Sequence, residues 1–140
     1  MDSDNNPMAA LATETEFMPG EAVVVSAPSP CTSFAAVFED DGETGYFYAL
    51  DTGKPDQIIL DALHVYDVAK VVDKQKVSRA EVVWSVDGLR VVLRINGYSQ
   101  PAFDFAKGRG YCRTGFPHPA AGEFSSIGHG WSDEVLDFFK

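Results

Sequence analysis

The stretch from Ala80 to Ile95 constrains the fold of this chain most, because it has the pattern of a β-hairpin. Apolar and polar residues alternate on both sides of Asp87-Gly88, a dipeptide typical of two-residue type I′ turns. The opposed pairs on the apolar face are then Ala80 and Ile95, Val82 and Leu93, Trp84 and Val91, and Val86 and Leu89. A slip of one residue would expose Trp84, so the pattern predicts both the register and a wholly apolar, buried face.

Further segments have the composition of strands. Phe34–Glu39 and Gly45–Asp51 form a second hairpin around residues 40–44, and apolar residues on both of their faces predict a place in the middle of a sheet. Ile58–Val68 has apolar spacing that fits a helix, but the β-forming residues near its end favour a strand. The remaining predicted strands are Glu21–Ala27 and, after a turn at Asn96-Gly97, an edge strand at Pro101–Phe105.

The C-terminal part has a different character. Residues 106–130 contain six glycines and two prolines without any period, which predicts a long loop. Ser132 has the features of an N-cap for a short helix over Ser132–Phe139. The fold class expected is therefore α+β and mainly β: an antiparallel meander sheet of about six or seven strands with one short C-terminal helix.

Residues 1–20 are polar and acidic at their start, and they predict a disordered acidic tail before a single β-rich domain over residues 21–140. The start lacks the basic and apolar regions of a signal peptide, and no stretch approaches the roughly 18 apolar residues of a membrane span. These features predict a cytoplasmic protein that binds no membrane.

The net charge of −10 is unevenly distributed along the chain. Residues 1–67 hold 13 acidic side chains and one basic one, whereas residues 68–140 hold 8 acidic and 10 basic ones. An acidic balance argues against nucleic acid as a partner, since such binding needs clustered Lys and Arg. It suits either a basic protein partner or solubility alone. The oligomeric state is left open.

The hypothesis that fits these features best is a small, acidic, non-catalytic protein-binding module, for example an immunity-like or adaptor protein. Carboxylates concentrate in the turn between the strands of the second hairpin, and tyrosines follow them; such aromatic residues are typical interface anchors. The candidate contact residues are Glu39, Asp40, Asp41, Glu43, Tyr46 and Tyr48.

Two alternatives remain open. A small hydrolase or transferase would use the 106–130 loop, with Arg109, Arg113, His118 and His129 as candidate site residues. A metal-stabilised domain would draw on Cys31, Cys112, His118 and His129, but their spacing matches no usual pair of zinc ligands, so neither a metal site nor a cofactor is predicted.

A weaker candidate for acid–base chemistry is the set Asp61, His64 and Asp67. If the segment is a strand, the side chains of Asp61 and His64 point to opposite faces, which weakens this candidate. Cys31 and Cys112 are too few for a disulfide framework and are expected as free thiols.

Four segments carry a resemblance to a known family: FAAVFEDDGETGYFYALD, ILDALHVYDVAKV, WSVDGLRVVLRINGYSQPAFDF and, near the end of the chain, GWSDEVLDFF. In this order they resemble a bacterial family of uncharacterised proteins, domain of unknown function 2251, over residues 31–140. The resemblance implies a bacterial origin. It implies no activity and no site residues, because the family has none assigned.

Overall fold

Nine strands and one 3-10 turn form the secondary structure of the described residues, which are 11–55, 58–72, 75–114, 128–133 and 135 of a computed structural model. The strands are β1 Leu11–Phe17, β2 Val23–Pro28, β3 Phe34–Asp40, β4 Thr44–Asp51, β5 Ile59–Asp67, β6 Ser78–Trp84, β7 Arg90–Ile95, β8 Tyr98–Asp104 and β9 Arg109–Cys112; the 3-10 turn η1 spans Val68–Lys70. All strand pairs are antiparallel.

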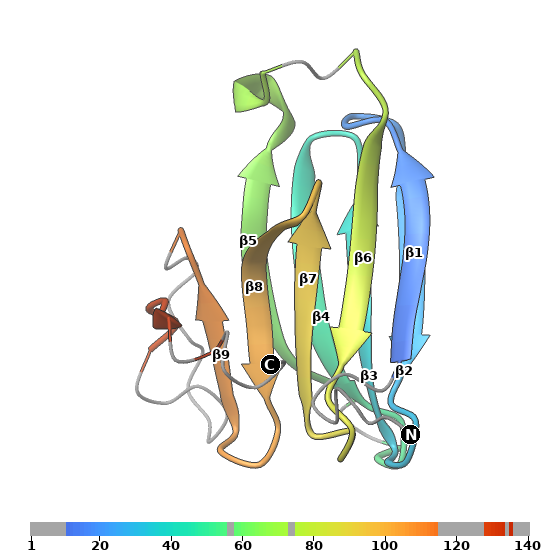
Figure 1. Cartoon of the computed structure of the whole chain (residues 1–140), viewed down its shortest axis with the longest axis vertical. Helices are drawn as coiled ribbons and strands as arrows, with labels where there is room; N and C mark the ends of the chain where they lie inside the picture. The colour runs from blue at the N-terminus through green and yellow to red at the C-terminus, as the bar shows by residue number, and fades with distance from the viewer. Residues whose placement is uncertain (1–10, 56–57, 73–74, 115–127, 134, 136–140) are drawn as a thin grey trace, which may run out of the picture.

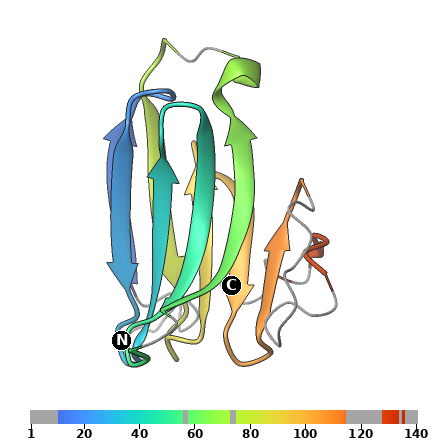
Figure 2. The same cartoon turned by 180° about the vertical axis from the view of Figure 1, so that it is seen from behind.

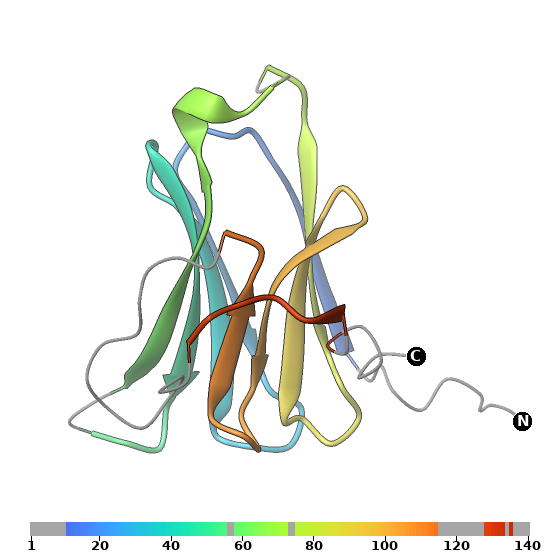
Figure 3. The same ribbon diagram turned by 90° about the vertical axis from the view of Figure 1, so that its left-hand side faces the viewer.

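The strands form two sheets packed face to face as a β-sandwich. The front sheet in Figure 1 has the order β1-β6-β7-β8-β9, and the back sheet, which faces the viewer in Figure 2, has the order β2-β3-β4-β5. Figure 3, an edge-on view, shows β9 and the segment 128–133 lying across one side of the sandwich. The fold is therefore mainly β, but the prediction of one meander sheet was wrong.

The core lies between the inner faces of the two sheets. Phe38, Phe47 and Leu63 of the back sheet are fully buried against residues such as Trp84 and Phe103 of the front sheet. The indole Nε1 of Trp84 donates to the carbonyl oxygen of Ala27, 3.1 Å away in the other sheet. Trp84 therefore combines apolar burial with a satisfied polar atom, as a buried indole requires.

The predicted hairpin register is confirmed, since Ala80 pairs with Ile95, Val82 with Leu93 and Trp84 with Val91. The two-residue type I′ turn was wrong. Gly88 N–H donates to the Ser85 carbonyl oxygen, and Gly88, with a φ of 69°, has the left-handed backbone conformation that Asp87 lacks. Five residues, Ser85 to Leu89, connect β6 and β7, and Val86, expected on the buried face, is 50 % exposed.

Side chains within the loop explain this difference. The Asp87 carboxylate accepts from the Ser85 hydroxyl at 2.6 Å and from the Leu89 N–H at 3.0 Å, so the loop backbone is organised by an Asp side chain. The type I′ geometry occurs instead at Asn96-Gly97, whose φ values of 53° and 83° are both positive.

The prediction of Pro101–Phe105 as the edge strand was also wrong, because β8 lies between β7 and β9. The register of β7 against β8 shifts between Val92 and Arg94, opposite Gln100 and Pro101. A proline without an N–H is accepted inside a sheet at such an irregularity, where the ladder of hydrogen bonds is already interrupted.

The two edge strands of the front sheet, β1 and β9, were not predicted from the composition of their segments. Leu11–Phe17 forms β1 and pairs with β6, so the predicted disordered tail was wrong over these residues, and residues 1–10 lie outside the described part. Arg109–Cys112 forms β9 inside the predicted long loop. Gly110 reads as a loop signal, but a Cβ there would lie 2.9 Å from Asp61 Oδ2, so the glycine permits close packing.

Most of the predicted C-terminal helix, Ser132–Phe139, lies outside the described residues. Val135 is fully buried against Val83, Val92, Ala102 and Tyr111, so this residue packs on the outer face of the front sheet. The strand predicted at Ile58–Val68 is confirmed by β5. Within the described ranges, no helix has the length and apolar character needed to cross a membrane.

Candidate functional site

His64 and Asp67 lie on the same face of β5 although three positions separate them. On a regular strand, residues at that spacing point to opposite faces. The register of β4 against β5 shifts so that Gly45 pairs with Tyr66 while Tyr46 pairs with His64, which leaves one extra residue in β5. This β-bulge re-aims the strand, and His64 Nε2 lies 2.9 Å from Asp67 Oδ1.

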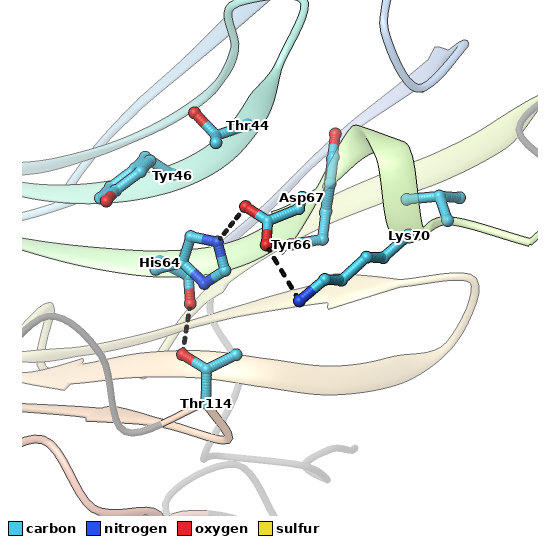
Figure 4. Close-up of a pocket in the computed structure, with 8 residues that line it drawn as sticks. Thr44, Tyr46, His64, Tyr66, Asp67, Lys70 and Thr114 are labelled. Atoms are coloured by element: carbon cyan, nitrogen blue, oxygen red, sulfur yellow. Dashed lines mark hydrogen bonds and ion pairs between the residues drawn. The ribbon is translucent and has the colours of Figure 1, made fainter.

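A groove of about 770 Å³ surrounds this pair (Figure 4). The second oxygen of Asp67, Oδ2, is 3.8 Å from Lys70 Nζ, and the Lys70 side chain is 84 % exposed. Thr114, which follows β9, donates its hydroxyl proton to the His64 carbonyl oxygen at 3.0 Å and closes the side of the groove opposite β4. The groove is lined by Thr44, Tyr46, His64, Tyr66, Asp67, Lys70, Val71 and Thr114.

The hydrogen bond from His64 lowers the pKa of Asp67 below its ordinary value of 3.8. A depressed carboxyl pKa contributes stability that is present above pH 3.8 and is lost as the pH falls through the lower folded value. We expect a ¹³C NMR titration of the Asp67 carboxyl to give a pKa below 3.8, and His64→Ala to raise it toward the ordinary value. An unchanged titration in that variant would contradict the assigned cause.

The acidic turn divides into buried and exposed carboxylates. Asp40 is only 1 % exposed and accepts from the Tyr66 hydroxyl at 2.6 Å, from Gly20 N–H at 2.9 Å and from Gly42 N–H at 2.8 Å. Burial and then the hydrogen bond to Asp40 raise the pKa of Tyr66 far above its usual range, which keeps the phenol a donor. Asp40 is therefore a structural residue, and its predicted place on the contact surface was wrong.

The other two acidic residues of this turn, Asp41 and Glu43, are exposed. Asp41 is exposed and accepts from the N–H groups of Thr44 and Glu43, both at 2.9 Å, and these bonds lower its pKa. The side chain of Glu43 is exposed, while its carbonyl oxygen accepts from Val68 N–H at 2.8 Å. The turn is thus tied to the end of β5 beside the groove.

Glu39, Tyr46 and Tyr48 lie together on the outer face of the back sheet. Glu39 pairs with Tyr46 across the strands, and the Tyr48 hydroxyl donates to Glu39 Oε1 at 3.2 Å. The rings of Tyr46 and Tyr48 stack with centroids 6.0 Å apart, and all three residues are half-buried. Glu39, Tyr46 and Tyr48 therefore share one face of the back sheet, while Asp41 and Glu43 lie in the turn that connects β3 to β4.

His129 belongs to a second histidine–carboxylate pair, which is buried. Its Nε2 lies 2.9 Å from Asp61 Oδ2, and the side chains are 1 % and 9 % exposed. Asp61 is on β5 and His129 is on the segment beyond β9, so this contact joins the two sheets at one side of the sandwich (Figure 3). As expected for a strand, Asp61 and His64 point to opposite faces of β5.

Both arginines of the alternative loop site contact the segment that carries His129, since Arg109 Nη2 donates to the Gly130 carbonyl oxygen at 3.5 Å and Arg113 lies beside Trp131. The Arg113 guanidinium lies 4.4 Å from the Tyr98 ring and 4.1 Å from the Trp131 ring. The Arg109 guanidinium lies 4.5 Å from the Tyr111 ring. Both arginines are thus engaged with aromatic residues, and His129 lies in the interior. His118 lies outside the described residues.

Of the residues of the hypothetical metal site that the structure describes, Cys112 and His129 are neighbours, joined by a hydrogen bond of 2.8 Å from Cys112 N–H to the His129 carbonyl oxygen, and Cys31 has other partners. Cys31 Sγ lies 3.1 Å from the Asp87 carbonyl oxygen, whereas Cys112 Sγ lies 2.9 Å from the His64 carbonyl oxygen. No group of three His, Cys, Asp or Glu side chains suited to a metal occurs in the described part of the chain.

Sequence reasoning did not identify Thr44, Lys70 or Thr114 as groove residues. Each is polar and follows or begins a strand, which is a common place for surface residues. The single available signal was the spacing His64, Asp67, Lys70, which places charged residues at every third position. Residues at this spacing share a face in a helix but not in a regular strand. Here they come together only because β5 contains a bulge and is followed by the 3-10 turn η1.

Comparison with known proteins places the chain in a family. It is 42 % identical over 113 residues, 80 % of its length, to an uncharacterized protein of Haemophilus influenzae, of which the match covers 70 %. No solved structure matches it. The model of the family described as "Uncharacterized protein conserved in bacteria (DUF2251)" matches residues 17–140. The chain therefore belongs to the DUF2251 family of bacterial proteins.

Proposed function

We propose that this protein is a non-catalytic module that binds a basic protein through the outer face of its back sheet. The surface consists of Glu39, Asp41, Glu43, Tyr46 and Tyr48 and is called the acidic aromatic face. The observation that carries the proposal is the stacked pair of tyrosines, half-buried and hydrogen-bonded through Tyr48 to Glu39. Pre-ordered aromatic rings bordered by carboxylates suit an anchor site for basic side chains.

The charge distribution supports a basic partner. Residues 23–67, which span the back sheet and its connections, contain eight acidic side chains and one basic one, Lys54. Such a one-sided charge attracts a basic surface, speeds the encounter and disfavours acidic partners. An immunity-like or adaptor role would use a surface of this kind to cover a basic site on another protein.

The described histidines favour binding over catalysis. His64 Nε2 is engaged by Asp67 and its Nδ1 is buried, so a substrate would reach neither nitrogen without rearrangement. The His129 imidazole is 1 % exposed and held by Asp61. A general base must come within hydrogen-bond reach of the proton that it removes.

The proposal is tested by replacing Glu39, Asp41 and Glu43 with lysine together, and separately by Tyr46→Ala with Tyr48→Ala. We expect either variant to lose at least about tenfold in the capture of a basic protein from a lysate of the source cells, measured by quantitative mass spectrometry. The captured protein, once purified, is then titrated against the same variants.

A matched control reverses the charges of Glu14, Glu16 and Glu81, which lie on the other sheet. We expect this control to capture the basic protein as the original chain does. Equal capture by all variants, or loss of capture only in the control, would contradict the acidic aromatic face as the binding surface.

A further inference from the structure

The groove beside the acidic aromatic face holds a carboxylate that is fixed on one side and loosely paired on the other. His64 Nε2 fixes Asp67 Oδ1 at 2.9 Å. Lys70 Nζ is 3.8 Å from Asp67 Oδ2, longer than a hydrogen bond, and the Lys70 side chain is 84 % exposed. Figure 4 shows Lys70 reaching toward Asp67 from the 3-10 turn η1. The Lys70 ammonium group thus lies beside Asp67 Oδ2 without a hydrogen bond that holds it there.

The groove continues onto the acidic aromatic face through Tyr46. This ring lines the groove, lies edge to face with the His64 ring at a centroid distance of 5.6 Å and also stacks with Tyr48. Thr44 and Thr114 also line the groove, and the Thr114 hydroxyl donates to the His64 carbonyl oxygen at 3.0 Å. An aromatic ring and a carboxylate around one opening are the groups that recognise a planar cation.

We propose that this groove binds an arginine side chain of the partner, with the guanidinium replacing Lys70 at Asp67 Oδ2 and lying against the Tyr46 ring. The source of the arginine rests on the proposed function, since the basic partner would supply it. Arginine fits better than lysine because its flat guanidinium can stack on a ring and donate to a carboxylate at the same time.

Displacement of Lys70 costs little. Exposed ion pairs contribute near zero to about 1 kcal/mol, or at most about fivefold in an equilibrium constant. The volume of about 770 Å³ is ample for the guanidinium and its methylene stem. Lys70 therefore competes weakly with the arginine for Asp67. Removal of the Lys70 side chain should strengthen arginine binding, whereas removal of the Asp67 charge should weaken it.

The test titrates the whole protein with N-acetyl-arginine amide and follows the aromatic NMR signals of Tyr46 and His64. N-acetyl-citrulline amide, which has nearly the same shape without the charge, and N-acetyl-lysine amide serve as comparison probes. We expect saturable shifts with the arginine probe, at least about threefold weaker binding of the lysine probe and none of the citrulline probe.

Substitutions complete the test. We expect Lys70→Ala to tighten arginine binding about threefold and Asp67→Asn to weaken it about fivefold or more. Asp51→Asn is the matched control, since Asp51 is another carboxylate of the back sheet, hydrogen-bonded to Ser33 and Gly53, and does not line the groove. It should leave the binding constant unchanged.

Absence of saturable shifts, equal binding of the arginine and lysine probes, or weaker binding after Lys70→Ala would overturn the guanidinium site. The capture experiment with the lysine variants of Glu39, Asp41 and Glu43 is independent of this titration. If capture depends on those residues while the arginine probe fails, the binding module stands and the arginine site falls. If the arginine probe binds as expected while capture is unaffected by the lysine variants, the guanidinium site stands and the acidic aromatic face falls as the binding surface.

Discussion

Trp84→Ala is expected to lower the free energy of unfolding by about 4 kcal/mol, because it removes the largest buried side chain from the interior of the sandwich. The indole is fully buried and stacks on Phe105 with ring centroids 5.7 Å apart. It also supplies the hydrogen bond to the Ala27 carbonyl oxygen, which joins the two sheets. Urea unfolding followed by circular dichroism measures the change.

Two further substitutions separate packing from hydrogen bonding. Trp84→Phe keeps most of the aromatic contact but leaves the Ala27 carbonyl oxygen without its donor, so we expect a loss of about 1 to 2 kcal/mol. Val86→Ala should change stability by less than about 0.5 kcal/mol, because Val86 is 50 % exposed in the loop. A large effect at Val86 would instead support the two-residue turn that the sequence predicts.

The second large effect is expected from Asp40→Ala, which should cost about 3 kcal/mol. The substitution leaves three donors without their acceptor: the Tyr66 hydroxyl and the N–H groups of Gly20 and Gly42. Hydrogen bonds to a charged group contribute about 1.5 to 3 kcal/mol each, and their losses are not additive where water can reach the donors. Chemical unfolding of the variant measures the change.

Tyr66→Phe removes only one of these three bonds, so we expect about half the effect of Asp40→Ala. Glu43→Gln is the control, since Glu43 is an exposed carboxylate of the same turn, and its expected effect is below about 0.5 kcal/mol. Equal stability of the Asp40 and Glu43 variants would show that the turn carboxylates are interchangeable, contrary to the buried network.

Local patterns in the sequence were enough to predict most of the strands. Alternation between Ala80 and Ile95 predicted the register of that hairpin, because a shift by one residue would reverse buried and exposed faces. The hairpin of β3 and β4 was predicted from its apolar strands and the turn between them, without a register. The strand β1 was missed because its polar residues, such as Glu14 and Glu16, belong to a sheet edge with an exposed face, and such a strand resembles a tail in composition.

The arrangement of the sheets could not be predicted in the same way. A sandwich of two sheets and a single covered sheet require a similar alternation of apolar and polar residues along their strands. The pairing of β1 with β6 and the side of the sandwich that β9 closes therefore depend on contacts between residues distant in the sequence. The bond between Asp61 and His129, which are 68 positions apart, is one such contact. No local pattern encodes a contact of that separation.

The sequence by itself determined most of the strands, the register of the hairpin between Ala80 and Ile95 and the acidic character of residues 1–67, because periodicity and charge are local properties. The tertiary structure alone decided that Asp40 is buried while Glu39, Asp41 and Glu43 remain accessible. It also decided that His64 and Asp67 share a face, through a bulge set by the pairing of β4 with β5. The physical reason is that burial and side-chain direction depend on what packs against each residue, and those neighbours come from elsewhere in the chain.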